Sequence, residues 1–384
     1  MKKFATTALV TALLVSSALP VSAQSYVVQN GDMLWQIAQR NGTSVNQLAK
    51  TNNLSNPNMI YPGQILEVSV VQNAESAKIV QIEKVTFESE GKQLVGNLYL
   101  PADYQPGQKR TAILVTGSWT TVKEQMAGLY AEKLAEQGFI TLAYDPRNFG
   151  ESEGDVPNYE NPEFKIQDIK NAVSYLESRN DVDHIGAFGV CAGAGYTLVA
   201  ASQDNRIEAV ATAASWIHDE EAVKGFYGGE EGVAQKIAAA QAAKVKYEAT
   251  GEIDYIKAIS TTDETAAMYG PYDYYLNPER GAVPEWNADQ FAVMTWEDWL
   301  TFNPRATAAN LEAPTLMVHS DGAVLPEYTK NYFNEIKTSD KKLIWLGTDI
   351  LPSPYHQFSF YDQDAEVNVS VAESAQWFTE KLGK

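Results

Sequence analysis

The sequence predicts an α/β protein with a mostly parallel sheet and helices on both faces, preceded by a small β-α-α-β module. From about residue 83 onward, short apolar runs alternate with helical segments, which is typical of parallel strands joined by crossover helices. Residues 24–70 instead contain two short strand patterns around two short helical patterns. The composition also changes between the two parts, because residues 24–70 are neutral and the excess of acidic side chains lies beyond residue 70.

The overall composition excludes several classes of protein. The formal net charge of −20 argues against nucleic acid as a partner, because phosphate binding needs a basic face. A hydrophobic fraction of 45% supplies a large core and excludes a mostly disordered chain. A single cysteine excludes a disulfide scaffold or a multi-cysteine zinc site within one chain. No other metal-ligand spacing is present, so we expect neither a metal nor a cofactor.

The first 23 residues read as a cleaved secretory signal. Met1-Lys2-Lys3 is basic, residues 4–19 are apolar and uncharged, and Val21-Ser22-Ala23 places small residues before a cleavage point at Gln24. A retained membrane anchor is the alternative, but the apolar stretch is shorter than a membrane span. We therefore expect a secreted protein without a membrane anchor.

The β-α-α-β module spans residues 24–70, and a polar linker is expected at residues 71–82. The pattern Tyr26-Val27-Val28-x-x-Gly31-Asp32-x-Leu34, with Leu48-x-x-x-Asn52-x-Leu54 and Pro62-Gly63-Gln64, resembles a LysM domain. This resemblance implies binding to N-acetylglucosamine glycans such as peptidoglycan or chitin, and so association with a cell wall. Leu34 and Ile60 also fit a purely structural role in the module's core. The resemblance implies the following glycan contacts: Gly31, Asp32, Met33, Leu34, Asn56, Pro57, Met59 and Ile60.

The body, residues 83–384, begins with an antiparallel strand pair at 85–87 and 94–100. Its further strands are expected at 111–116, 139–144, 184–190, 209–213, 315–319 and 342–346. Helices are expected around 126–134, at 164–176 and at 369–382. Between the strands that end near residue 214 and begin at 315, about 100 residues exceed the usual crossover length.

This insertion, at about 216–310, is expected to form a helical lid over the active site. Its stretch from 236 to 248 is alanine-rich and helical, and many aromatic residues follow. These aromatic side chains either line an apolar or sugar-stacking pocket or pack the lid onto the body.

A glycine-flanked cysteine is the most informative motif of the body. Gly189-Val190-Cys191-Ala192-Gly193 joins a strand to a helix, where a nucleophile sits on a sharp turn and projects above the sheet. The glycines two residues before and after it let the backbones approach each other. The alternative is a buried structural cysteine, but the position and the flanking glycines favour a nucleophile.

The other members of the site follow from chain order, because folds with this turn place the nucleophile, the acid and the base in that sequence. The base is expected at His356, in the loop after the last strand. The acid is expected at Asp321, although an ordinary Asp-Gly turn competes there; Asp219 is the second choice and Glu327 a weaker one. Backbone N–H groups of Ala192 and of Ser118 or Trp119 are expected to form the oxyanion hole.

Further segments of the body resemble the dienelactone-hydrolase-like branch of the α/β-hydrolases. They are Val122-Lys123-Glu124-Gln125, Asp145-x-Arg147-x-Phe149-Gly150-x-Ser152-x-Gly154, Gly189-x-Cys191-x-Gly193, Met317-Val318-His319-Ser320 and Phe358-x-Phe360-Tyr361-Asp362. The resemblance implies an α/β-hydrolase fold over residues 83–384. The sequence thus predicts a wall-associated hydrolase of carboxylic esters, acting on a small-molecule ester through a Cys191-His356-Asp321 triad. Two alternatives stay open: an inactive, hydrolase-like wall-binding protein, and an amide hydrolase acting on peptidoglycan.

Overall fold

The computed structural model describes residues 22–29, 37, 48, 51–52, 54, 60–70, 80–347 and 353–384. The chain divides into two compact units, Met1–Ala77 and Lys78–Lys384, and each is described by itself.

The first unit is built on one antiparallel strand pair. Strand β1 (Ser22–Val27) pairs with β2 (Ile65–Val70). The side chain of Asn52 bonds both the carbonyl and the N–H of Glu67, which ties a turn to β2. A small apolar core lies beside the strands and consists of Val28, Ile37, Leu48, Leu66 and Val68.

The second unit is organised around an eight-stranded sheet with the order β14-β13-β8-β7-β5-β6-β4-β3. The pairs β3–β4 and β4–β6 are antiparallel and all the others are parallel, so the predicted fold class is confirmed. The strands are β3 (Gln81–Ser89), β4 (Lys92–Leu100), β5 (Arg110–Thr116), β6 (Ile140–Tyr144), β7 (Val182–Val190), β8 (Ala209–Ala213), β13 (Thr315–Ser320) and β14 (Lys341–Leu346).

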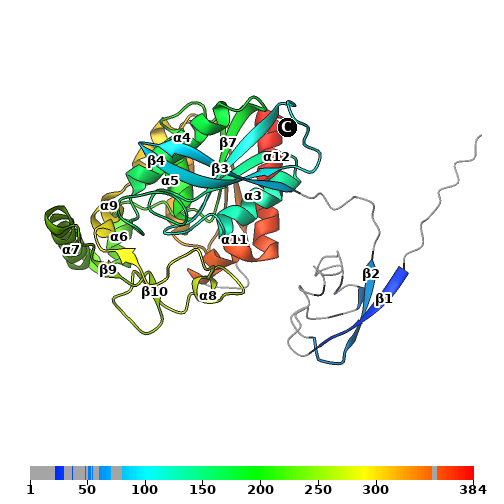
Figure 1. Ribbon diagram of the computed structural model, residues 1–384, viewed down its shortest axis with the longest axis horizontal. Coiled ribbons are helices and arrows are strands. Elements are labelled where there is room, and N and C mark those ends of the chain that lie inside the picture. The colour runs from blue at the N-terminus through cyan, green and yellow to red at the C-terminus, as the bar shows by residue number, and fades with distance from the viewer. Residues whose placement is uncertain are drawn as a thin grey trace, which may run out of the picture. The chain divides into compact units, whose positions relative to one another are not determined.

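Helices cover both faces of this sheet (Figure 1). On one face, α3 (Met126–Glu136) and α12 (Asp364–Leu382) contact each other and the strands beneath them. On the other, α4 (Pro162–Glu177) packs against α5 (Ala192–Ala201). After β13 comes α10 (Pro326–Glu335), and the short turn η2 (Tyr355–Phe358) with α11 (Ser359–Asp362) leads from β14 toward α12.

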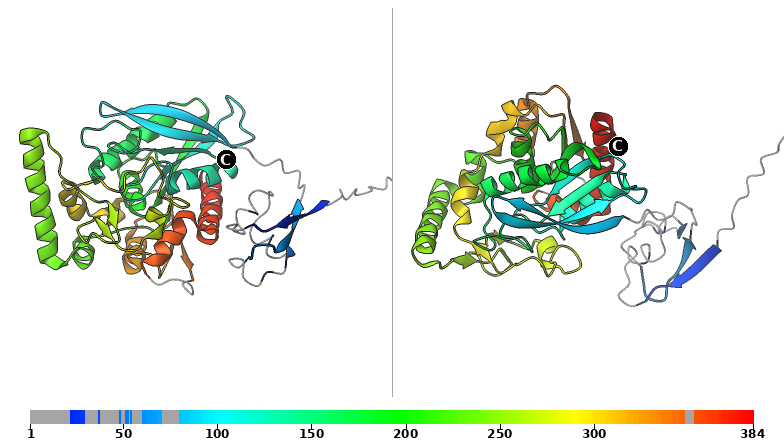
Figure 2. Two further views of the ribbon diagram at one scale, coloured as in Figure 1. Left: turned by 60° about the horizontal axis from the view of Figure 1, so that its bottom comes forward. Right: turned by 45° about the horizontal axis from the view of Figure 1, so that its top comes forward.

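The insertion between β8 and β13 consists of short elements around one long helix. They are α6 (Glu220–Phe226), α7 (Gly229–Thr250), β9 (Tyr255–Ile256), β10 (Ile259–Ser260), β11 (Met268–Tyr269), α8 (Asp273–Leu276), β12 (Phe291–Ala292), α9 (Thr295–Thr301) and η1 (Pro304–Asn310). Helix α7 lies at the edge of the body, and only Ala240 and Ala243 of it are buried (Figure 2). Several aromatic residues of the insertion are buried, so they pack it onto the body: Tyr274, Tyr275, Trp286, Phe291, Trp296 and Trp299. Within the described residues, no helix is long and apolar enough to cross a membrane.

Candidate active site

The site is centred on the sharp turn between β7 and α5. Cys191 has φ 55° and ψ −120°, a combination that L-residues rarely adopt and that costs about 1–3 kcal/mol. A Cβ at Gly189 would lie 2.6 Å from the Cα of Ala194, and one at Gly193 would lie 2.1 Å from the carbonyl oxygen of Gly117. The turn therefore requires both flanking glycines, as the sequence pattern indicates.

The thiol of Cys191 is enclosed, since the residue is 4% exposed. Burial raises the pKa of this thiol, and hydrogen bonds that stabilise the thiolate partly offset the increase. Those bonds come from the side chains of Ser118, Tyr361 and Gln357 and from the N–H of Ala192. The sulfur thus has donors around it, but its protonated form is favoured at neutral pH.

The side chains around the sulfur also bond to one another. The hydroxyl of Ser118 lies 3.3 Å from the phenolic oxygen of Tyr361, and the hydroxyl of Tyr275, from the insertion, donates to Ser118 Oγ at 3.4 Å. Gln357 Nε2 donates to the Tyr361 oxygen at 3.3 Å. A connected set of neutral groups therefore surrounds the thiol, and each of these groups is a poor proton acceptor at pH 7.

His356 does not provide the expected base, because both of its ring nitrogens have other partners. Nδ1 lies 2.7 Å from Ser320 Oγ, and Nε2 lies 3.0 Å from Glu366 Oε1. The ring is buried, with 2% exposed. The predicted pairing of His356 with Cys191 is therefore corrected: the histidine is held by β13 and α12, and Gln357 is the residue of this turn that contacts the sulfur.

Gln357 is firmly held in that place. Its Nε2 donates to the carbonyl of Ala214 at 2.7 Å, and its Oε1 accepts from the N–H of Val324 at 3.1 Å. His356 and Gln357 both belong to the 3₁₀ turn η2, in which successive side chains point about 120° apart. His356 and Gln357 consequently face different sides of the turn, and of these two residues it is Gln357, an amide, that faces the thiol.

None of the three carboxylates proposed as the acid meets a histidine at the nucleophile. Asp321 is exposed and pairs with Lys330 at 3.2 Å, and a hydrogen bond with Trp345 is the main cause of its lowered pKa. Glu327 pairs with the same lysine. Asp219 accepts two backbone N–H bonds as the N-cap of α6 and pairs with Arg305. The predicted triad is therefore not assembled.

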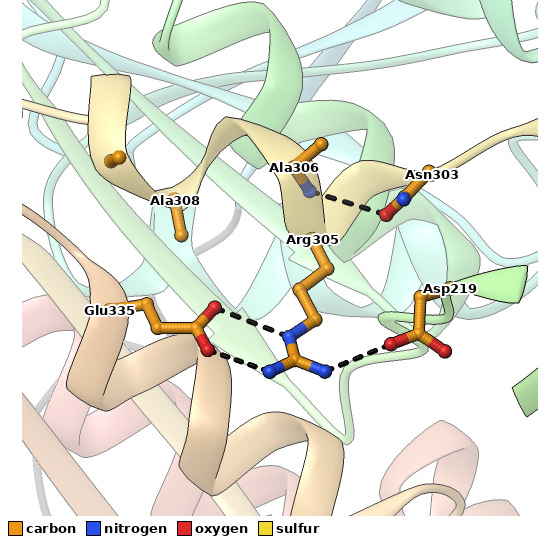
Figure 3. A pocket seen from close by; sticks show the side chains of 7 residues that line it. Asp219, Asn303, Arg305, Ala306, Ala308 and Glu335 are labelled. Carbon is orange, nitrogen blue, oxygen red and sulfur yellow. Dashed lines mark hydrogen bonds and ion pairs between the residues drawn. The ribbon is translucent and has the colours of Figure 1, made fainter. Parts of the chain in front are cut away.

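Arg305 lies between Asp219 and Glu335 at a surface pocket of about 470 Å³ (Figure 3). The guanidinium bonds both carboxylates, at 2.9 Å to Asp219 and 2.7 Å to Glu335. The pocket's charges are thus already paired with each other, and this arrangement explains Asp219 as a structural residue.

The loop expected to complete the oxyanion hole follows β5. Ser118 lies by the sulfur through its side chain, whereas the ring of Trp119 packs 4.9 Å from Phe291, measured between ring centroids. The N–H of Thr120 donates to Glu160 and its carbonyl accepts from Trp286 Nε1. A buried carboxylate and the insertion together fix this loop beside the turn of Cys191.

The remaining histidines have structural roles. Burial lowers the pKa of His218 and of His319 to about 4, so both rings are neutral at pH 7. His218 Nδ1 accepts from Trp216 Nε1, and its Nε2 bonds the carbonyl of Trp299. His184 is near the surface and pairs with Glu208.

One cluster of carboxylates has the spacing of a metal site but already surrounds a lysine. Oxygens of Glu124, Asp145 and Glu151 lie within 4.8 Å of one another. Lys123 Nζ lies 2.6, 2.7 and 2.9 Å from these three carboxylates, and they raise its pKa against the effect of burial. The ammonium therefore supplies the cation of this cluster.

Ile60 is the one predicted glycan contact among the described residues. It is half-buried and packs against the small core of the first unit, which agrees with the structural alternative for this side chain. The other predicted contacts lie outside the described residues: Gly31, Asp32, Met33, Leu34, Asn56, Pro57 and Met59.

The sheet order, the covering helices and the turn at Cys191 together define an α/β-hydrolase-type body. Residues 90–348 match the X-Pro dipeptidyl-peptidase (S15) family, and the chain belongs to that family. Residues 26–69 match the LysM domain, so a LysM domain precedes the body.

Several curated proteins are similar to parts of the body. YcjY of Escherichia coli is 43% identical over 134 residues, which cover 34% of this chain and 44% of that protein. PA2218 of Pseudomonas aeruginosa is 41% identical over 140 residues, covering 36% and 37% of the two chains. The thiohydrolase aneE of Aspergillus aculeatus is 31% identical over 144 residues, covering 37% and 43%. The chain thus spans less than half the length of each of these relatives.

Solved structures resemble the body over most of its length. The crystal structure of PA2218 superposes with a TM-score of 0.69 at 26% identity, covering 80% of this chain and 95% of that one. The α/β-hydrolase GrgF from a Penicillium species superposes with a TM-score of 0.65 at 20% identity, covering 79% and 100%. The second likeness concerns the fold alone.

Proposed function

We propose that this protein is a secreted, wall-associated hydrolase of acyl esters and thioesters in which Cys191 is the nucleophile. The observation that supports it is the strained turn, which places the sulfur beside the N–H of Ala192, at the start of α5. A backbone N–H at a helix start can stabilise an oxyanion next to the attacking atom. The likeness to the dienelactone-hydrolase-like branch belongs to this proposal.

The proposed reaction has two steps. The thiolate attacks the acyl carbon, a thioester bond forms, and the bond to the leaving alcohol or thiol breaks. The leaving group takes up the proton that Cys191 released. Water then attacks the thioester, giving a carboxylic acid and the free thiol. Both steps conserve atoms and electrons without a cofactor.

The groups around the sulfur restrict the substrate class. An amine leaving group must be protonated as it departs, which needs a positioned acid such as imidazolium, and the described residues place no imidazole at Cys191. A thiol or an acidic alcohol leaves as an anion without such help. We therefore favour thioesters and activated esters over amides, and the name of the thiohydrolase relative agrees with this choice.

The LysM domain provides the proposed location. Residues 1–23 direct export and are removed, which takes Ser22 and Ala23 from β1 and leaves residues 24–27 paired with β2. The domain then holds the body at N-acetylglucosamine glycans of peptidoglycan or chitin. The substrate is a small acyl ester, or an acyl group carried on the glycan. Nucleic acid and membrane have no part in this proposal.

Steady-state turnover tests the proposed hydrolase. p-Nitrophenyl acetate and S-phenyl thioacetate are assayed from pH 6 to 10 with the wild type and Cys191→Ala. Because the thiol pKa is raised, turnover should be slow at pH 7 and still rising above pH 9, and it should be lost in the variant. Equal rates in the two proteins, or a bell-shaped optimum near pH 7, would contradict the proposal.

A second candidate is a wall-binding protein without turnover, and one observation favours it. Gln357 stands at the thiol where a hydrolase of this chain order carries its base. Absence of Cys191-dependent turnover at every pH, together with sedimentation of the protein with purified peptidoglycan, would select this candidate over the first.

A further inference from the structure

A buried chain of hydrogen bonds links α12 to the end of β13. Glu366 Oε1 lies 3.0 Å from His356 Nε2, and His356 Nδ1 lies 2.7 Å from Ser320 Oγ. The exposed fractions are 8% for Glu366, 2% for His356 and 0% for Ser320. Because a carboxylate only accepts, Nε2 carries the hydrogen, and in the neutral ring Ser320 donates to Nδ1 while accepting from the N–H of Ala323.

This chain has no part in the attack described above, yet it is costly to bury. A buried carboxylate and a buried imidazole destabilise a fold unless their hydrogen bonds are satisfied. Here they are satisfied by each other and by Ser320. The middle member, His356, directly precedes Gln357 in the same short turn, η2.

The position of Gln357 depends on that turn. Its amide donates to the carbonyl of Ala214, directly after β8, and to the phenolic oxygen of Tyr361, and it accepts from the N–H of Val324 in the loop after β13. The same amide lies beside the sulfur of Cys191. A 3₁₀ turn of four residues has few backbone hydrogen bonds of its own, so its orientation depends on side-chain anchors. The chain through His356 is such an anchor, on a different side of the turn from the thiol.

We propose that Glu366 is a positioning residue: through His356 and Ser320 it fixes the turn η2 and so holds the amide of Gln357 against the sulfur of Cys191. The inference rests on the proposed function only in treating Cys191 as the reactive group. Gln357 Nε2 donates to the carbonyl of Ala214 and to the phenolic oxygen of Tyr361, whose hydroxyl stabilises the thiolate, and Glu366 keeps this amide in place.

The sign of the effect separates positioning from two simpler roles. If Glu366 acted on the thiol only through its negative charge, removing that charge would stabilise the thiolate and speed its alkylation. If Glu366 only stabilised the fold, its loss would expose the thiol and also speed alkylation. Loss of a positioned donor instead destabilises the thiolate and slows alkylation.

Alkylation by iodoacetamide measures this directly, because Cys191 is the single cysteine of the full chain. Glu366→Met, which keeps the length but removes the acceptor, should slow labelling at pH 8 about five-fold, the value of one hydrogen bond of about 1 kcal/mol. Glu366→Gln keeps an acceptor oxygen and should restore most of the rate. Asp364→Asn, an exposed acid in the same helical turn, should leave the rate unchanged.

A double-mutant cycle then tests the route. Gln357→Met should slow labelling like Glu366→Met, and the double variant should be no slower than either single one. Ser320→Ala offers a milder break of the same chain if Glu366→Met fails to fold, and it should also slow labelling. Faster labelling in the Glu366 or Ser320 variants, or additive effects in the cycle, would overturn the proposal. Labelling needs no turnover, so an inactive enzyme would not affect this result.

Discussion

At Cys191 the conformation and the environment have opposite effects on reactivity. The strained turn presents the sulfur to the N–H of Ala192, which favours attack on a carbonyl. Burial raises the pKa of the thiol, which lowers the fraction of reactive thiolate at neutral pH. The neighbouring amide of Gln357 stabilises the thiolate but cannot take up its proton. We therefore expect the residue at position 357 to limit the rate of the proposed reaction.

Replacing that amide by imidazole should activate the thiol. Gln357→His places a base at the sulfur, so turnover of p-nitrophenyl acetate at pH 7 should rise by at least about ten-fold, the lower part of the range for general-base catalysis. The rate should also become less dependent on pH above 8. Gln357→Asn, which keeps an amide and adds no base, is the matched control. An unchanged rate in Gln357→His would argue against Cys191 as the nucleophile.

The sequence identified one residue of the site more securely than the others. The glycines two residues before and after Cys191 indicate a backbone that passes very close to its neighbours, such as Gly117. A Cβ at either position would clash, so steric exclusion alone accounts for this spacing. Chain order indicates only a loop for the base, and His356 is the one histidine in that loop. A neighbouring signal was available: Gln357 precedes Tyr361 by four residues, the spacing of side chains on one helical face.

At the scale of elements, the parallel strands were the easiest to predict. All residues of β5, β6, β8 and β13 are buried, so each is dominated in the sequence by apolar residues instead of alternating with polar ones. The insertion was far harder, because it contains two-residue strands and helices of four to seven residues, which are too short to show a period. Its long helix α7 was found through its alanines but begins seven residues earlier than expected.

The geometry of the turn η2 explains why Gln357, and not the predicted His356, faces the thiol. Its 3₁₀ geometry separates His356 from Gln357 by about a third of a turn. Long-range partners then decide which residue faces the thiol, since Glu366 and Ser320 lie 10 and 36 residues away from His356. A single sequence does not contain those pairings, so it predicts the triad but not the hydrogen-bond chain from Glu366 through His356 to Ser320.

At the scale of the whole molecule, two buried histidines make stability depend on pH. The pKa of His218 and of His319 is about 4 in the fold and 6.5 without burial. Well above pH 6.5 neither state binds the proton. Between pH 6.5 and 4 the unfolded chain is protonated first, so stability falls as pH falls, by about 2 kcal/mol per histidine at pH 5.

Thermal unfolding of the full chain at pH 7 and pH 5 tests this linkage. The wild type should lose melting temperature on acidification, and His218→Gln or His319→Gln should lose less, because each removes one titrating group. His184→Gln is the control, since that ring is near the surface and pairs with Glu208. The same loss in all four proteins would show that other groups cause the acid sensitivity.

The proposed function divides between the two units. We propose that the LysM domain binds the glycan, and the acidic body carries the site at Cys191. The proposed hydrolase function depends on whether the body forms an acyl-enzyme at Cys191.

Intact mass spectrometry of the full chain after brief incubation with S-phenyl thioacetate at pH 9 tests that point most directly. Deacylation needs an activated water and no base lies at the sulfur, so the thioester should accumulate. The account predicts a mass increase of one acetyl group, located on the peptide containing Cys191 and absent from Cys191→Ala. An unmodified chain in the presence of turnover, or an acetyl group on another residue, would contradict it.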